Sequence, residues 1–116
     1  MQTTKKLENL LEALQLAFKK GHLTFWVLLS VRDSSRYSEE IISFINAESK
    51  GYINPEIMSL YRTLRRLEEL NLVSYKNVSS DVGPEKKYYS LTNDGAYVLK
   101  EFIKTNIYAY KNINIF

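Results

Sequence analysis

Three arginines lie in a segment whose leucines recur at the spacing of one helix face. They are Arg62, Arg65 and Arg66. A helix with this pattern turns its leucines to the core and its arginines to solvent. An exposed arginine can bind a phosphate, or donate two hydrogen bonds to O6 and N7 of guanine in the DNA major groove. The alternative is a solvated helix face, in which Glu68 and Glu69 neutralise the arginines.

A second basic group stands at the start of a short apolar segment. Lys86 and Lys87 directly precede Tyr88 and Tyr89, at the end of a polar stretch typical of a hairpin tip. Lysines at this place can lie along a phosphate backbone. The alternative is that they protect an edge strand against aggregation.

The chain offers little for catalysis or metal binding. His22 is its only histidine and it has no cysteine, which excludes a cysteine–histidine pair, a multi-histidine metal site and a disulfide framework. It has no glycine-rich phosphate loop. The acidic pairs at 39–40 and 68–69 are neighbours on predicted helices, where adjacent side chains point in different directions. We therefore expect no enzyme activity, no metal and no cofactor.

Hydrophobic periodicity and end signals predict the elements that position these residues. Helices are predicted over 7–18, 23–31, 38–48, 55–70 and from 93 onward, and strands over 72–76 and 87–91. Gly21 is predicted to end the first helix, and Asn54 with Pro55 to begin the fourth. Asn71 is predicted to take the left-handed conformation after that helix, and Thr92 to cap the last one.

Length and composition favour one small globular domain. The chain has 116 residues, of which 45% are hydrophobic and 25% charged, with a net charge of +3. Its longest apolar run, 25–29, is far too short to span a bilayer, so no membrane association is expected. The absence of cysteine and of an N-terminal apolar stretch predicts a cytoplasmic protein.

The element order predicts a mainly α fold with a small β-hairpin (α+β). Three helices followed by a hairpin form a winged helix-turn-helix, in which the third helix enters the major groove and the hairpin touches the flank. An extra N-terminal helix and a C-terminal dimerisation helix complete this prediction. We divide the single structural unit into an N-terminal helix at 1–20, a winged domain at 21–92, and a dimerisation helix with its tail at 93–116.

Two sequence blocks resemble a known family. The first is Leu60-Tyr61-x-x-Leu64-x-Arg66-Leu67-Glu68, followed by Leu72-Val73. The second is Lys87-Tyr88-Tyr89-x-Leu91-Thr92-x-x-Gly95. Together they resemble the recognition helix, the wing and the start of the dimerisation helix of the PadR family. The resemblance implies a sequence-specific, homodimeric DNA-binding transcriptional regulator, often a repressor.

The resemblance also implies roles for single residues. Ser59 and Tyr61 match positions near the DNA backbone, and Lys87 matches a basic residue of the family's wing. Tyr61 could equally be an aromatic at the edge of the core that positions the helix. The wing departs from the family pattern, because Pro84 and Glu85 stand where basic residues are usual. This departure supports the alternative function, a winged-helix protein-interaction module without DNA binding.

Two partners beyond DNA are predicted. The N-terminal and final helices each carry an apolar stripe too wide for one small core, which predicts a homodimer bound to a roughly palindromic operator. A small aromatic effector is the second, with Phe18, Phe25 and Trp26 as candidate contacts near the junction of the first two predicted helices. Core packing is the alternative role of these three aromatic residues.

Overall fold

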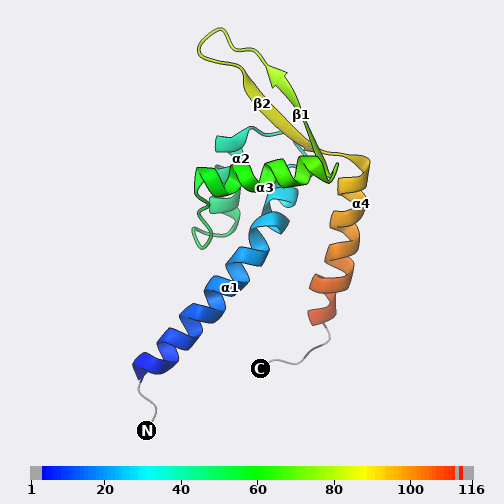
Figure 1. The fold of residues 1–116 in the computed structure, drawn as a ribbon. Coiled ribbons are helices and arrows are strands. Elements are labelled where there is room, and N and C mark those ends of the chain that lie inside the picture. The colour runs from blue at the N-terminus through cyan, green and yellow to red at the C-terminus, as the bar shows by residue number, and fades with distance from the viewer. Residues whose placement is uncertain (1–3, 112, 114–116) are drawn as a thin grey trace.

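The protein folds into helices around a small core, with one β-hairpin projecting from it (Figure 1). The computed structural model describes residues 4–111 and 113, but not the side chains at 15 and 17–21. In order, the elements are α1 (Thr4–Ser30), α2 (Ser38–Glu48), α3 (Ile57–Glu69), β1 (Val73–Val78), β2 (Lys86–Leu91), α4 (Asn93–Phe102), the π-helical turn η1 (Ile103–Ile107) and the 3₁₀ turn η2 (Tyr108–Tyr110). This arrangement confirms the predicted α+β winged-helix fold.

The first helix differs from its prediction. α1 is one continuous helix of 27 residues, so the predicted break at Gly21 was wrong. A glycine inside a helix costs only about 1 kcal/mol relative to alanine. That cost is small beside the packing of the C-terminal half of α1, where Val27 and Leu28 are at most 5% exposed. Figure 1 shows the N-terminal half of α1 extending away from the core.

The core forms where α1, α2, α3, β1, β2 and α4 meet. Leu60, Leu64 and Leu67 of α3 are at most 1% exposed, which confirms the predicted core stripe of this helix. Other elements contribute Val27, Leu28, Val31, Ile41, Ile45, Ile53, Val73, Tyr89 and Leu99. The three leucines therefore determine which face α3 turns outward.

α3 begins two residues later than predicted. The helix starts at Ile57, and Glu56 before it is extended with ψ near 145°. Before the helix, Ser49 Oγ accepts from the Ile53 amide at 3.0 Å and donates to the Ile53 carbonyl at 3.2 Å. Pro55 in turn disfavours helical backbone at the residue before it. At the other end of α3, Asn71 has φ of +60°, as predicted.

The hairpin is antiparallel and joined to the helical core by a short third pairing. Val73 of β1 pairs with Leu91 of β2, and the register continues to the pair Val78 and Lys86. Arg36 forms an isolated antiparallel bridge with Tyr89. Its amide donates to the Tyr89 carbonyl at 3.0 Å, and the Tyr89 amide donates back at 2.9 Å. No sequence signal predicted this bridge.

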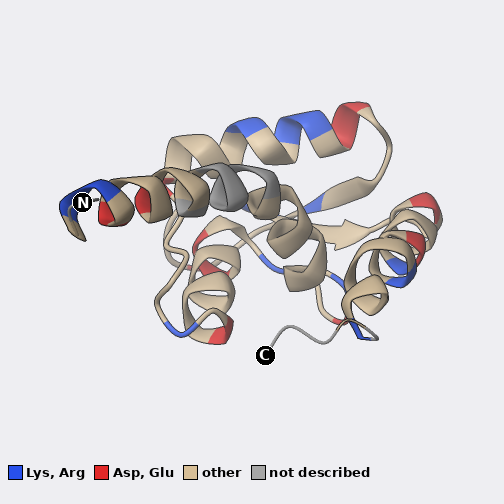
Figure 2. Ribbon diagram, turned by 90° about the horizontal axis from the view of Figure 1, so that it is seen from below, with Lys and Arg blue, Asp and Glu red and all other residues tan. Residues whose placement is uncertain are grey.

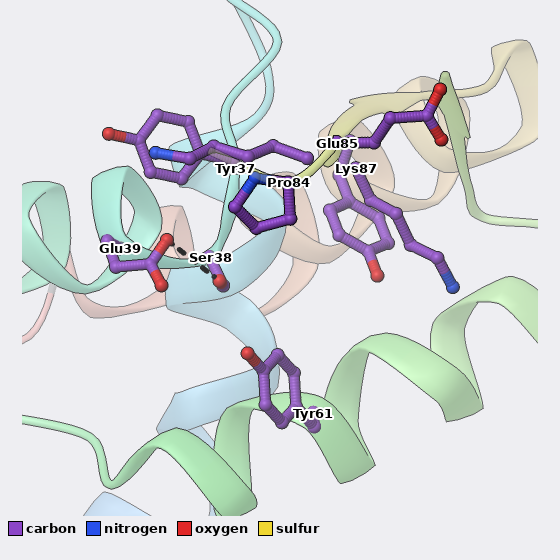
Figure 3. Close-up of a pocket in the computed structure, with 9 residues that line it drawn as sticks. Tyr37, Ser38, Glu39, Tyr61, Pro84, Glu85 and Lys87 are labelled. Atoms are coloured by element: carbon purple, nitrogen blue, oxygen red, sulfur yellow. Dashed lines mark hydrogen bonds between the residues drawn. The ribbon is translucent and has the colours of Figure 1, made fainter. Parts of the chain in front are cut away.

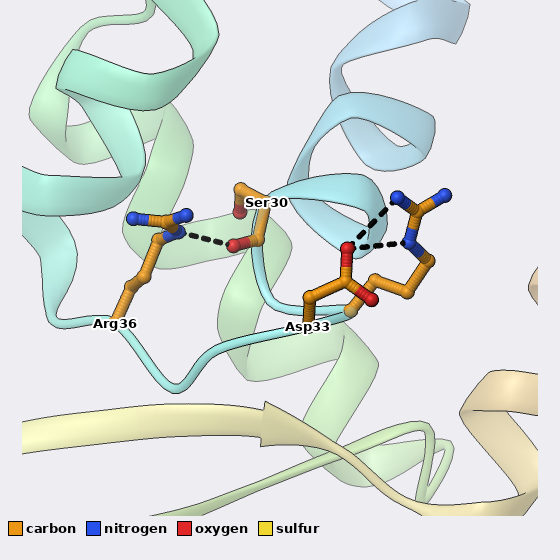
Figure 4. Close-up of polar contacts among 4 residues, drawn as sticks. Ser30, Asp33 and Arg36 are labelled. Carbon is orange, nitrogen blue, oxygen red and sulfur yellow. Dashed lines mark hydrogen bonds and ion pairs between the residues drawn. The ribbon is translucent and has the colours of Figure 1, made fainter.

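The side chain of Arg36 strengthens the same junction (Figure 4). Its Nε donates to the Ser30 carbonyl at 2.6 Å, and its guanidinium lies 4.7 Å from the Phe44 ring centroid. Arg32, by contrast, pairs with the neighbouring Asp33 at 2.8 Å in a solvent-exposed position. The hydrogen bond from Arg32 lowers the pKa of the Asp33 carboxyl. Arg36 is therefore a structural arginine, whereas Arg32 remains at the surface.

α4 begins as predicted, against the turn that ends α3. Thr92 Oγ1 accepts from the Gly95 amide at 2.9 Å and donates to the Asn71 carbonyl at 2.7 Å. The backbone of α4 at Gly95 lies so close to the backbone at Leu72 that a Cβ at position 95 would overlap the Leu72 carbonyl oxygen. Only glycine fits this crossing.

The last helix changes geometry after Phe102. It continues as η1 and η2 instead of the single α-helix predicted to include Tyr110. Asn106 Nδ2 donates to the Phe102 carbonyl at 3.1 Å. This bond links the π-helical turn to the last residue of α4.

Replacement of Gly95 by alanine tests the close crossing. Helix propensity alone predicts that Gly95→Ala stabilises α4 by about 1 kcal/mol. Overlap with the Leu72 carbonyl predicts the opposite, a loss of about 1–3 kcal/mol in the free energy of unfolding measured in urea. Ala96→Gly, one residue along, is the control for propensity alone. An increase in stability for Gly95→Ala would contradict the described contact.

Arg36 and Arg32 form a matched pair for a second stability test. Arg36→Ala removes a charged hydrogen-bond donor from a partly buried carbonyl, and should lower the free energy of unfolding by about 1–3 kcal/mol. Arg32→Ala should change it little, because the pair with Asp33 is exposed to solvent. Equal losses from the two substitutions, measured by thermal and urea unfolding, would refute the structural role of Arg36.

Candidate nucleic-acid interface

The outer face of α3 is basic. Arg62, Arg65 and Arg66 are all exposed, opposite or beside the buried leucines. Arg62 Nη2 donates to Ser59 Oγ at 3.2 Å, which orients its guanidinium along the helix. α3 is described in full, and none of its arginines forms an ion pair with Glu68 or Glu69 there. Figure 2 shows this basic stretch of α3 at one edge of the molecule, followed by the acidic end of the helix.

A groove separates α3 from the hairpin, here called the wing, with the start of α2 at its end (Figure 3). It is lined by Tyr37, Ser38, Glu39, Tyr61, Pro84, Glu85, Lys86, Lys87 and Tyr89. Tyr61 reaches it from α3 with 42% of its surface exposed. The structure thus brings Tyr61 together with both predicted wing lysines, and shows that Tyr61 is not a buried core residue.

The two wing lysines lie over different aromatic rings. Lys86 Nζ is 4.0 Å from the ring centroid of Tyr37, and Lys87 Nζ is 4.4 Å from that of Tyr75. Such cation–π contacts are worth about 0.5–1 kcal/mol at exposed sites, and they leave the positive charge unneutralised. The lysines are therefore held in defined positions but remain available to an anion. Tyr75 went unnoticed in the sequence because its contact depends on the hairpin register, and Tyr37 because it comes from a segment distant in the sequence.

Tyr89 forms the inner end of the groove. It is 6% exposed, and its ring lies 5.7 Å from that of Tyr75. Burial raises the pKa of the Tyr89 hydroxyl above its usual value, so this group stays neutral at physiological pH. Its backbone bridge to Arg36 attaches the wing to the core at the same point. The position of both lysines relative to α3 therefore depends on Tyr89.

Arg66 lies on the other flank of α3, away from the groove. It lines a mainly apolar pocket between α1, α3 and α4, together with Thr24, Phe25, Leu28, Thr63, Leu67, Leu70, Leu72, Val98 and Phe102. Phe25 and Phe102 are in contact there, with ring centroids 5.2 Å apart. The structure separates Arg66 from the wing, whereas helix periodicity did not distinguish it from Arg62 and Arg65.

Of the predicted aromatic contacts, Phe25 and Trp26 have different surroundings. Phe25 lines the pocket beside Arg66, but Trp26 packs against the core and does not line that pocket. The side chain of Phe18 lies outside the described part of the structure. An effector site at these three residues stays a prediction, and Phe25 is the one whose surroundings are a pocket.

Within residues 4–111 and 113, no three acidic, histidine or cysteine side chains gather closely enough to hold a metal ion. Over the same residues, none of the helices combines the length and the apolarity that crossing a membrane requires.

Comparisons with known proteins place the chain in a family. The model of the PadR-like family of transcriptional regulators matches residues 27–101. A PadR-like transcription factor from Bacteroides fragilis is 28% identical, with a TM-score of 0.71, and the match covers 85% of this chain and 93% of the other. Comparison with the curated proteins gave no match.

Two further solved structures share the fold. A PadR family regulator from Eggerthella lenta is 21% identical with a TM-score of 0.71, over 96% of this chain and all of the other. Bacillus subtilis PadR, solved in complex with operator DNA, is 21% identical with a TM-score of 0.64, over 70% of this chain and 46% of the other. The family match covers more than half of the residues and coincides with the winged domain and α4, and the chain therefore belongs to the PadR-like family of transcriptional regulators.

Proposed function

We propose that this regulator binds a roughly palindromic operator in double-stranded DNA as a homodimer and acts as a repressor. α3 enters the major groove, and the wing lies on the adjacent phosphate backbone. The relative from B. subtilis, whose structure contains operator DNA, supports DNA as the partner. The role places the protein in the cytoplasm, with the DNA it regulates, and requires no catalytic step.

The observation that carries the proposal is the presence of cations on both elements that border one groove. Lys86 and Lys87 line the groove from the wing, and Arg62 and Arg65 are exposed on α3, the helix whose Tyr61 lines the groove. None of these four side chains is neutralised by an ion pair in the described part of the chain. Free cations on two neighbouring elements suit a polyanion that contacts both, because each phosphate contact releases a counterion.

Separate contacts follow from these positions. Arg62 is opposite the core stripe and reaches furthest outward, so it is our first candidate for a base edge. Arg66 remains a candidate for a base or phosphate contact on the opposite flank. Ser59, Tyr61, Arg65, Lys86 and Lys87 are proposed to contact the backbone.

A homodimer is supported by apolar surface that the single chain leaves uncovered. Leucines of the N-terminal half of α1 are 55–68% exposed. They are Leu7, Leu10, Leu11, Leu14 and Leu16. Tyr97, Val98 and Phe102 of α4 are also exposed by 40% or more. Contiguous apolar surface of this kind marks protein contacts, and a second copy of the chain can cover both helices at once.

The rival function is a winged-helix module that binds proteins and not DNA. Salt dependence separates the two, because binding through several phosphates weakens steeply with log salt. Nonspecific duplex bound with such a slope supports the regulator. Absence of duplex binding at low salt by the folded dimer would favour the module.

A part of the proposal concerns an aromatic effector in the pocket at Phe25 and Phe102. A bound planar compound should quench the nearby Trp26 fluorescence and lower DNA affinity in parallel. Quenching without any change in DNA affinity, over a broad panel of aromatic compounds, would leave Phe25 and Trp26 only a packing role.

DNA contacts on α3 and the wing should differ in kind. Operator sequences are first selected from random duplex DNA. Arg62→Ala should then cost about 1–3 kcal/mol of binding free energy and relax the preference at one base position. The Lys86→Ala/Lys87→Ala variant should weaken all sequences alike and reduce the salt slope by about one unit for each phosphate that is no longer neutralised.

Lys5→Ala/Lys50→Ala removes the same charge from positions away from the groove and is the matched control. The proposal fails if three folded, dimeric variants all bind the selected DNA as tightly as the parent. These are Arg62→Ala, Arg66→Ala and the wing variant, and this result would show that the surface does not bind DNA.

The dimer should depend on the leucines of α1. At micromolar concentration the parent should sediment as a dimer, and Leu10→Ser/Leu14→Ser should shift it toward monomer because the variant loses buried apolar area. Glu8→Ser/Glu12→Ser alters the same helix at charged exposed positions and should leave the dimer intact. A monomeric parent would contradict the homodimer.

A further inference from the structure

A cavity of about 380 Å³ lies beside α4, away from the groove proposed to bind DNA. It is lined by Arg32, Leu91, Ala96, Leu99, Lys100, Ile103, Lys104 and Tyr108, and we call it the α4 cavity. Its volume falls in the range of small-molecule sites. Its lining combines one apolar surface with three cations, an arrangement that neither the DNA interface nor the aromatic prediction uses.

The apolar part of the α4 cavity is mainly aliphatic. Leu99 is 2% exposed and anchors it to the core, while Leu91 and Ile103 are half-buried beside it. Tyr108 supplies the only aromatic ring of the lining. Burial of a flexible hydrocarbon chain against such a surface is favourable by about 25 cal/mol for each Å² removed from water.

The cations come from two different parts of the chain. Lys100 and Lys104 are four residues apart, on α4 and on the π-helical turn that follows it, and Arg32 is in the loop after α1. π-helical turns occur frequently at functional sites. Here the turn includes two of the lining residues, Ile103 and Lys104.

Acidic neighbours neutralise this charge only in part. Asp33 Oδ2 forms an ion pair with Arg32 Nη2 at 2.8 Å. Glu101 Oε2 lies 3.7 Å from Lys104 Nζ, near the limit for an ion pair. No ion pair or hydrogen bond to the Lys100 ammonium is formed within the part of the chain that the structure describes. A net positive charge therefore remains at the edge of the aliphatic surface.

We propose that the α4 cavity binds a small amphipathic carboxylate with an aliphatic chain. The carboxylate accepts hydrogen bonds from Lys100 and Lys104, with Arg32 adding to the positive field. The chain lies against Leu91, Leu99 and Ile103. We infer an anionic ligand because an uncharged chain leaves the three cations without a ligand partner. We infer an aliphatic chain because most of the apolar lining is leucine, isoleucine and alanine, with one tyrosine.

This ligand joins segments that belong to different parts of the fold. Leu91 is the last residue of the wing strand β2, and Arg32 lies in the loop that continues to the bridge residue Arg36. The α4 cavity does not overlap the groove proposed to bind DNA, because no residue lines both.

Calorimetry without DNA is the direct test, with octanoate as the probe and 1-octanol as its uncharged counterpart. Octanoate should bind with a saturable stoichiometry of one per chain, and at least fivefold more tightly than octanol. Amide shifts in NMR spectra should change at Leu91, Leu99, Lys100 and Ile103. Because no operator is present, failure here leaves the DNA proposal untouched, and failure to bind DNA leaves this one untouched.

Two variants locate the site. Lys100→Gln/Lys104→Gln should weaken octanoate about five- to tenfold, as expected for two partly exposed charge pairs, and leave octanol unchanged. Ala96→Phe should block the aliphatic surface and abolish binding of both. Lys5→Gln/Lys50→Gln removes equal charge elsewhere and should bind octanoate like the parent.

Three outcomes would overturn the proposal. The first is equal affinity for octanol and octanoate, and the second is unchanged octanoate affinity in the folded lysine variant. The third is the absence of saturable binding by the folded parent, which includes the case of a cavity covered by a second copy.

Discussion

Tyr89 of the wing joins the hairpin to the helical core. Its backbone exchanges two hydrogen bonds with Arg36, and its ring is buried between the hairpin and the core. A two-stranded hairpin alone is at best marginally stable in water, so this bridge supplies what β1 and β2 lack. Arg36 is fixed in turn by the Ser30 carbonyl and the Phe44 ring. The position of the wing lysines relative to α3 follows from this chain of contacts.

Periodicity predicted those features that depend on local chemistry. The core stripe of α3, the left-handed Asn71 and the cap at Thr92 each follow from neighbours within a few residues, and the structure confirms all three. The exposed position of Arg62 also follows from the stripe, because a helix with one buried face must present the other.

Features that depend on tertiary contacts were missed or misplaced. The bridge at Arg36 joins segments more than fifty residues apart, so no local pattern indicates it. The break predicted at Gly21 is absent because the packing of the C-terminal half of α1 offsets the small cost of a glycine inside a helix. The placement of Arg66 on the apolar flank depends on where α4 docks, which helix periodicity alone does not determine.

The unbroken α1 has a mechanical consequence. At 1.5 Å per residue its 27 residues form a rod of about 40 Å, one end of which lies in the core beneath α3. A rod transmits a tilt at one end as a displacement at the other, whereas two helices joined at Gly21 would absorb it in the joint. In the proposed homodimer, held together by the outer half of α1, the separation of the two α3 helices would depend on the angle between the two rods. A change of a few degrees in that angle would move each α3 by ångströms.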